Sequence, residues 1–423
     1  MFEKLLQIWK AKDLRKNILF VLGALVLFRL LAHIPVPGVN VENLRAFFSG
    51  NQLLGLMNIF AGGGMSNFSI VMLGVAPYIT ASIIFQLLAM IIPKLEEMSK
   101  EEGGRQKINV YTRLATVPLA LLQAFGMINL LNQSSRPILE NMSGWYLACT
   151  MIIITAGTVF LMWLGELITE RKIGNGISLL IFAGIIAGLP SAVNEMMVNF
   201  NKAQFMNLIV FAAIAAITIA GVVIINEAQR NIPVVYAKRI RGARMYGGTS
   251  THLPIRINQA GVIPIIFAIS VILFPPMIAQ FMLRADTAAI VSAAKWIIDL
   301  FQNQIFYGVS YFVLVFAFTY FYTAVIFHPT QIADNLQKHG GFVPGIRPGT
   351  QTSGYLQNII GRITLAGALF LSIIAVLPLL MKQATGMQSL VIGGTSLLIV
   401  VSVVIETIKQ VESQLLMRDY EGL

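Results

Sequence analysis

The chain has 423 residues with a formal net charge of +11 at pH 7, and 56% of its residues are apolar whereas only 12% are charged. Together with a mean hydropathy of +0.75, these values exclude an ordinary soluble protein and indicate a protein that crosses a membrane several times. The single cysteine, Cys149, excludes an internal disulfide and a cysteine metal cluster.

Residues 1–17 are basic and amphipathic, and because no small-residue cleavage site follows them, we expect no removable signal peptide. Beyond them, ten apolar runs approach the length that a helix needs to cross a bilayer, which is roughly 20 residues. The runs cover about residues 18–36, 72–92, 114–131, 145–168, 177–198, 207–225, 258–281, 305–327, 363–381 and 388–408.

Ten spans divide into two sets of five, and because five is odd, the second set enters the membrane inverted relative to the first. We therefore predict an all-α membrane protein of two pseudo-symmetric, inverted five-helix halves, residues 1–200 and 201–423. Lysine and arginine are concentrated in the segments that lie on the same side of the membrane as the amino terminus, which are those that follow an even number of spans. Because cationic loops stay in the cytoplasm, both termini are predicted to be cytoplasmic.

Residues 53–70, LLGLMNIFAGGGMSNFSI, precede the second apolar run. They are apolar enough to enter the membrane, but three consecutive glycines, Gly62 to Gly64, interrupt them, and each glycine disfavours a helix by about 1 kcal/mol relative to alanine. Within lipid, such irregular backbone is tolerated only where protein or a water-filled cavity surrounds it. Two interpretations remain open: an external loop that dips into the interface, and a re-entrant segment lodged in a cavity.

Two apolar segments place paired isoleucines on one helical face. Ile79 and Ile83 lie in GVAPYITASIIFQLL at 74–88, and Ile177 and Ile181 lie in GNGISLLIFAGI at 174–185. Side chains four residues apart lie on one helical stripe, so each pair could line an apolar pore. Isoleucines in membrane helices more often face lipid or neighbouring helices, so the spacing alone leaves both roles open.

Polar residues outside these faces suggest further roles. The segment 227–257 holds six cations, and Arg347 lies among prolines and glycines in the 329–358 loop. Both segments suit docking to phosphate backbones or acidic protein patches, although positive-inside charge with anionic lipid is the alternative. Arg29 is expected to pack or to pair with a carbonyl. Arg171 and Lys172 lie next to Glu166 and Glu170 and are expected to form a local ion-pair turn with them.

Six blocks spread along the whole chain resemble the SecY family, the channel subunits of the bacterial Sec protein translocon. The blocks are HIPVPG at 33–38, GVAPYITASIIFQLL at 74–88, GNGISLLIFAGI at 174–185, STHLPIRINQAGVIP at 250–264, HGGFVPGIRPG at 339–349 and GGTSLLIVV at 393–401. The resemblance implies a protein-conducting channel that is not an enzyme and holds no cofactor. It also implies an hourglass pore with an external plug, and a seam between spans 2 and 7 that releases transmembrane segments into lipid.

The resemblance assigns roles to particular residues. The pore ring comprises Ile79, Ile83, Ile177, Ile181, Ile266 and Ile399, with Leu398 as the alternative to Ile399. The plug lies at about 53–66 and includes Leu56, Met57, Asn58, Gly62, Gly63 and Gly64. The lateral gate includes Thr80, Gln86, Asn258 and Gln259, although buried amides can also simply hold helices together. The surface for the SecA ATPase and the ribosome comprises Lys238, Arg239, Arg241, Arg244, Arg256 and Arg347.

The same resemblance implies a location and partners. The location is the bacterial plasma membrane, and the partners are the small subunits SecE and SecG, the SecA ATPase, the ribosome, signal peptides, nascent chains and membrane lipids. Bacterial relatives often have paired arginines where this chain has Ala243 and Arg244, which leaves ribosome binding through that pair open. The rival class is a secondary transporter, and it is disfavoured because no Asp or Glu lies in the middle of a run.

Overall fold

The computed structural model describes most of the chain, in segments separated by gaps. These segments are residues 10–50, 58, 61–132, 138, 143–198, 205–236, 239–241, 244–246, 250–283, 287–385 and 393–421. Within them the protein is mostly helical, and a helix overlaps each of the ten apolar runs. The helices before residue 200 are α2 (Lys12–Leu31), α3 (Val41–Gly50), α5 (Ala76–Ile91), α6 (Pro93–Lys100), α7 (Glu102–Asn132), α8 (Gly144–Glu170) and α9 (Gly176–Val198). Those after it are α10 (Phe205–Glu227), α11 (Ile263–Met282), α12 (Ala288–Gln302), α13 (Gln304–Ile326), α14 (Pro329–Lys338), α15 (Thr350–Thr385) and α16 (Gly393–Glu421).

Four helical stretches in the described residues are long and apolar enough to cross a membrane. They are Gly103–Asn132, Gly144–Glu170, Gln304–Lys338 and Thr350–Leu380. The number rises to five if α5 and α6, which meet at a bend of 111°, form one broken span. Shorter apolar helices cover Gly176–Pro190, Ala212–Glu227 and Ile263–Ala279. The chain is therefore a multi-pass membrane protein, and the total of ten spans stays a prediction.

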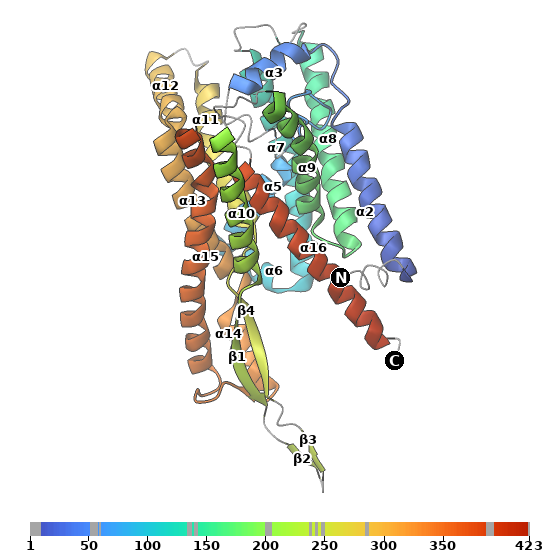
Figure 1. Cartoon of the computed structure of the whole chain (residues 1–423), viewed down its shortest axis with the longest axis vertical. Helices are drawn as coiled ribbons and strands as arrows, with labels where there is room; N and C mark the ends of the chain where they lie inside the picture. Colours follow the sequence, from blue (N-terminus) through green and yellow to red (C-terminus); the bar gives the residue numbers. More distant parts are fainter. Residues whose placement is uncertain are drawn as a thin grey trace.

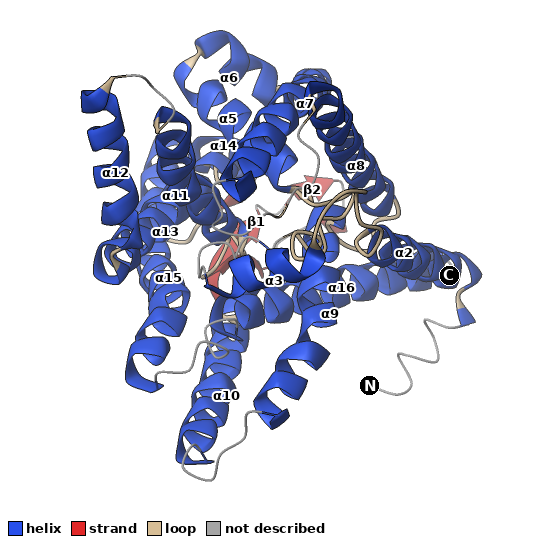
Figure 2. Ribbon diagram, turned by 90° about the horizontal axis from the view of Figure 1, so that it is seen from above, coloured by secondary structure: helices blue, strands red, loops and turns tan. Residues whose placement is uncertain are grey.

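The helices form two groups that lie side by side (Figure 1). Helices α2, α7, α8 and α9 belong to one group, α11, α12, α13 and α15 belong to the other, and α16 crosses obliquely between them. Helix α16 contacts α9 as well as α10 and α15, and α5 contacts α11. Seen from above, the helices stand around a middle region in which loops lie (Figure 2).

Two buried apolar clusters hold this arrangement together. The first, here called the central cluster, collects side chains from α2, α5, α8, α9, α11, α13, α15 and α16. The second lies between α3, α7, α8 and the turns before α5. Residues 61–75 join the two, because Met65 and Phe68 are buried in the second cluster whereas Val71 and Val75 are buried in the central one.

A small sheet interrupts the helical fold where the sequence predicted only a loop. Strand β1 (Gln229–Tyr236) pairs antiparallel with β4 (Ser250–Arg256) and with β5 (Gly341–Phe342). Alternate residues of β1, Ile232 and Val234, are buried, and Ile232 packs with Leu356 of α15. The all-α prediction therefore omitted this sheet, although the alternation of apolar residues is typical of a half-buried strand.

The predicted ion-pair turn after α8 forms a different set of contacts. Glu166 pairs with Arg113 of α7, with Oε1 2.6 Å from Nε. Arg171 instead places its guanidinium carbon 4.5 Å from the centre of the Phe20 ring on α2. Glu166 and Arg171 thus have other partners than the expected local turn gave them, because helix packing brings residues from distant parts of the sequence close to both.

Candidate functional site

Helix α5 places two of the predicted ring isoleucines in the core. The helix has Pro77 in its first turn, where a missing backbone N–H costs nothing. Ile79 and Ile83 lie one turn apart and are 9% and 4% exposed. The paired-isoleucine face of α5 is therefore turned into the protein rather than toward lipid.

Helix α9 brings the second pair to the same cluster. Its start is fixed by Asn175, whose Oδ1 accepts a hydrogen bond from the Ser178 N–H at 3.1 Å. The start also lies tightly against α8, since a Cβ added at Gly176 would come within 1.8 Å of the Gly165 carbonyl oxygen. Ile181 is then 1% exposed, while Ile177 is partly buried against the same cluster.

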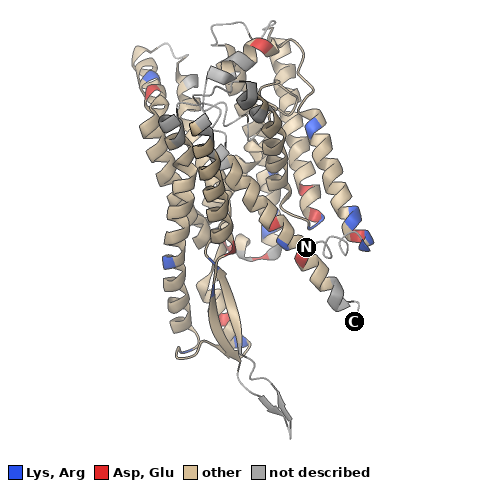
Figure 3. Ribbon diagram, viewed as in Figure 1, with Lys and Arg blue, Asp and Glu red and all other residues tan. Residues whose placement is uncertain are grey.

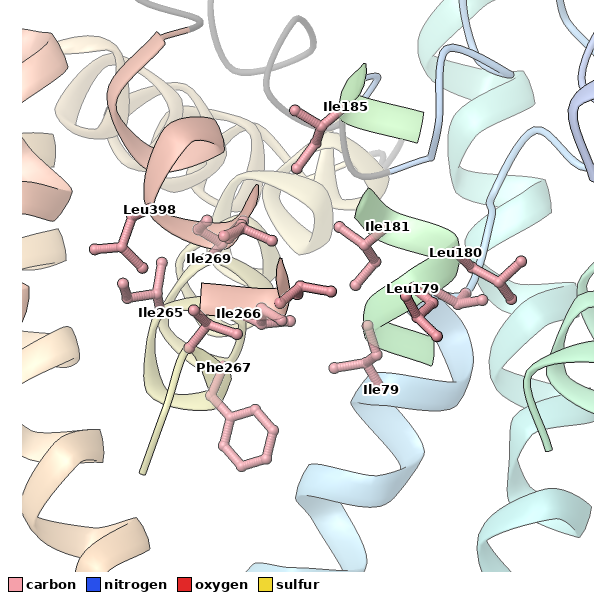
Figure 4. Close-up of a cluster of buried hydrophobic side chains, with 14 of the residues drawn as sticks. Ile79, Leu179, Leu180, Ile181, Ile185, Ile265, Ile266, Phe267, Ile269 and Leu398 are labelled. Atoms are coloured by element: carbon pink, nitrogen blue, oxygen red, sulfur yellow. The ribbon is translucent and has the colours of Figure 1, made fainter. Parts of the chain in front are cut away.

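Helices α11 and α16 contribute the remaining ring residues. Ile266 of α11 is 7% exposed, and Ile399 of α16 is fully buried. Figure 4 shows Ile79 and Ile181 directed toward α11, whereas Leu398 points away from them. Leu398 therefore gains no support as the substitute for Ile399.

All six predicted ring residues belong to or pack against the central cluster. We call these six residues the candidate ring: Ile79, Ile83, Ile177, Ile181, Ile266 and Ile399. Their side chains offer water and ions no hydrogen bonds, and a narrow constriction lined by such groups excludes both by dewetting. The arrangement is therefore suited to a seal that needs no charged gate.

The segment predicted as a plug is partly described. Leu56 and Met57 lie outside the described residues, whereas Asn58 and Gly62 to Gly64 lie inside them. Asn58 holds the turn together, because its Oδ1 accepts from the Ser66 N–H at 2.9 Å and its carbonyl accepts from the Gly63 N–H at 2.7 Å. Ala61 and Met65 are 2% and 1% exposed. Of the two open interpretations, these contacts favour a segment lodged inside the protein.

The end of this segment is attached to the block HIPVPG. The Val36 N–H donates to the Phe68 carbonyl at 2.9 Å, and the Ile70 N–H donates to the Ile34 carbonyl at 3.1 Å. Pro35 and Ser69 form the antiparallel bridge between these two bonds. We call this contact the plug anchor. Sequence reasoning missed it because each segment contributes only one bridge residue, so neither has the alternating pattern of a strand.

Among the described residues, no hydrogen bond joins the predicted gate residues across the seam between α5 and α11. On α5, the Gln86 Nε2 donates to Ser82 of the same helix at 3.0 Å. Asn258 Nδ2 donates to Asn226 Oδ1 of α10 at 2.7 Å, and Asn226 Nδ2 donates to Ser402 Oγ of α16 at 2.7 Å. Asn258, in the loop before α11, is therefore linked to α10 and, through Asn226, to α16, which is the alternative role for a buried amide.

The other two gate residues lie in the interior without a bond across the seam. Thr80 is 4% exposed on α5, and the buried Oε1 of Gln259 has no hydrogen-bond partner among the described residues. Helices α5 and α11 contact each other. Apolar packing thus supplies the contact between these two helices in the part of the chain that the structure describes.

The predicted docking cations lie on and beside the sheet. Lys238 is outside the described residues, while Arg239, Arg241 and Arg244 lie on the paired strands β2 (Arg239–Arg241) and β3 (Arg244–Tyr246). These strands form a tip that extends away from the helices (Figure 1). Arg256 ends β4, and the Arg347 carbonyl accepts from Thr352 Oγ1 at 2.8 Å.

Charged residues are unevenly distributed over the helices. Figure 3 shows few of them along the middle of the helical bundle and more toward its lower end, where the sheet and the start of α2 also lie. The sheet and the basic start of α2, with Lys12, Arg15 and Lys16, therefore lie toward one end of the molecule. This is the distribution that the positive-inside pattern predicts for cytoplasmic segments.

The fold is that of protein-conducting channels. A solved protein-conducting channel matches with a TM-score of 0.62 at 17% sequence identity, covering 93% of this chain and 91% of that chain. Sec61 in a canine ribosome–channel complex from the endoplasmic reticulum matches with a TM-score of 0.60 at 17% identity, covering 93% and 91%. The yeast Ssh1 complex bound to the ribosome matches with 0.63 at 13% identity, covering 92% and 88%.

Sequence relatives narrow this class to one family. The protein translocase subunit SecY of Halalkalibacterium halodurans is 43% identical, over 100% of this chain and 99% of the relative. SecY subunits of Mycobacterium tuberculosis and Streptomyces coelicolor are 44% and 43% identical, covering 97% and 98% of this chain and the same shares of the relatives. The SecY family model matches residues 69–408. The chain belongs to the SecY family.

Proposed function

We propose that this chain is the channel subunit of a protein translocase, which passes unfolded polypeptides across a membrane and releases transmembrane segments sideways into lipid. The observation that carries the proposal is the central cluster, in which isoleucines from α5, α9, α11 and α16 meet although they are far apart in the sequence. The translocase name of the relatives supports it.

The candidate ring has the properties that such a channel needs. At rest, branched aliphatic side chains in contact leave no path for hydrated ions. During transport, the same side chains can change rotamer and surround any passing residue, because apolar contacts have no preferred direction. A polar ring would bind some side chains of the cargo more strongly than others and retain them.

The layout that we propose has ten spans in two inverted halves, residues 1–200 and 201–423, around an hourglass pore. A helix over each apolar run supports the count. The plug at about 53–66 closes the external side, and the seam between α5 and α11 opens to lipid beside Thr80, Gln86, Asn258 and Gln259. The location is the bacterial plasma membrane with both termini in the cytoplasm, which agrees with the start of α2 lying toward the same end of the molecule as the sheet.

The partners that we propose follow from the same layout. The tip formed by β2 and β3, together with Arg256 and Arg347, receives the SecA ATPase or the ribosome at the cytoplasmic end. Two of the matched solved channels are themselves in ribosome complexes. SecE and SecG are the proposed small membrane subunits.

The test is transport by the purified chain in reconstituted vesicles. With its small subunits, a soluble motor ATPase and ATP, the channel is expected to import an unfolded protein that carries a signal peptide, and import is expected to stop without ATP. Vesicles without the chain are the control. Accumulation of a small solute without a motor, in the absence of protein import, would instead establish a secondary transporter.

A further inference from the structure

Arg29 on α2 is a cation in an unfavourable place. It lies in the last turn of the helix and is partly buried. In the proposed orientation this is the external end of the first span, so the positive-inside pattern does not explain it. An ionisable group at such a depth needs a partner, because burying an unpaired charge costs several kcal/mol.

The partner is the segment proposed as the plug. Arg29 Nη1 donates a hydrogen bond to the carbonyl oxygen of Gly62, 33 residues further along the chain. Among the described residues, this is the only hydrogen bond of the Arg29 side chain. The bond therefore joins a transmembrane helix to a segment of turns, and it is charge-assisted, which makes it stronger than a bond between neutral groups.

The backbone of Gly62 is held closely at the same point. Its φ is +68°, and a Cβ added there would lie 2.4 Å from Cζ of Phe28 and 3.3 Å from Cα of Gly184. Phe28 is 2% exposed and is part of the central cluster. Gly184 lies on α9, which also carries Ile181 of the candidate ring. We call Phe28, Arg29, Gly62 and Gly184 the plug seat.

We propose that Arg29 is a positioning residue that holds the plug in its closed place through the Gly62 carbonyl. The proposal rests on the proposed channel function. Of the four residues of the seat, only Gly62 can move away easily, because α2 and α9 are packed into the core whereas Gly62 belongs to a turn. When a threading chain displaces the turn, water in the opened funnel can solvate the guanidinium, so the bond favours closure without preventing opening.

The experiment measures ion leak through resting channels that contain Arg29→Met, which keeps the side-chain bulk and removes the donor. In reconstituted vesicles or planar bilayers without motor or cargo, we expect the resting conductance to rise by about tenfold, at the lower end of what a charge-assisted bond contributes. Lys295→Met on α12 is the matched control, since it removes an exposed cation, and it is expected to leave the conductance unchanged. If Arg29→Met is not recovered from the membrane, Arg29→Gln carries the same test, because its amide is too short to reach.

Testing Arg29→Met in a chain that lacks the proposed plug distinguishes a role in holding the plug from a general structural role of Arg29. Deleting residues 57–65 removes the proposed plug and is expected to raise the resting conductance while leaving motor-driven import intact. In this background Arg29→Met is expected to cause no further rise. A further rise, or an unchanged conductance for Arg29→Met in the full chain, would overturn the proposal. Failure of the unmodified chain to import protein would overturn the channel function instead, whatever the conductance of the variants.

Discussion

The candidate ring and the plug seat lie close together but are held by opposite kinds of contact. The ring consists of aliphatic side chains that belong to or pack against one apolar cluster. The seat depends on one charged donor, one carbonyl and a glycine with no room for a side chain. Apolar contacts have no direction, so the ring tolerates changes of shape and fails only when polarity changes. A hydrogen bond and a glycine packed tightly against its neighbours tolerate neither a change of shape nor a change of polarity. The seat therefore specifies one closed position.

The largest expected effect is a charge in the ring. Ile181→Asp buries a carboxylate at a site that is 1% exposed, which costs about 3 kcal/mol or more when no partner is present. We expect a large fall in the thermal midpoint in detergent and a leak in the resting state, since the constriction is then wetted. Ile181→Leu is the control and is expected to cost less than about 1.5 kcal/mol with no leak. Equal behaviour of the two variants would contradict a sealing role for this side chain.

An intermediate effect on the resting conductance is expected at Gly62 of the plug seat, which can be compared with its neighbour Gly63. Gly62 and Gly63 both have positive φ, +68° and +77°, so alanine at either position is strained by about 1–2 kcal/mol. Only Gly62 also lacks space, because a Cβ at Gly63 meets nothing nearer than Arg29 Nη1 at 4.0 Å. Gly62→Ala is therefore expected to raise the resting conductance several-fold above Gly63→Ala. Similar conductances would show that strain alone, and not the fit against Phe28, governs closure.

The smallest effect is expected for a directed contact at the surface. Lys409 Nζ lies 2.8 Å from Glu227 Oε1, with side chains that are 31% and 48% exposed. Solvent screens such a pair, so Lys409→Met is expected to change the free energy of unfolding by less than about 1 kcal/mol. The thermal midpoint measures it, with Lys295→Met as a second exposed cation. A loss as large as that of Gly62→Ala would mean that direction of contact matters at the surface as much as in the seat.

The sequence predicted the helices better than it predicted the contacts between them. Each apolar run is overlapped by a helix because apolar length is a local property that composition reveals. The pairing of Glu166 with Arg113 depends on how α7 and α8 pack, and no local pattern contains that information. The strand β5 has only 2 residues and lies about a hundred residues beyond β1, so no local pattern predicts their pairing, whereas the alternation in β1 was a local signal that the prediction overlooked.

The candidate site shows the same limit. Helical spacing alone gave Ile79 and Ile83 a common face, but only the family resemblance placed Ile266 and Ile399 with them. The structure brings these residues into one cluster, while their role in a pore remains our proposal. For Arg29, the expected pairing with a carbonyl is confirmed. The identity of the carbonyl lay beyond the sequence, since it depends on where a glycine turn comes to rest.

The plug anchor sets a limit on the travel of the proposed plug. The two hydrogen bonds that join Ile34 and Val36 to Ile70 and Phe68 fix one end of the segment beside α2. The six Cα-to-Cα steps from Gly62 to Phe68 span at most roughly 20 Å when fully extended. Gly62 can therefore leave the axis by a distance comparable to half the membrane thickness while its root stays in place. In the proposed function, this short connection keeps Gly62 within reach of the plug seat, so that the plug can close again each time the cargo has left the pore.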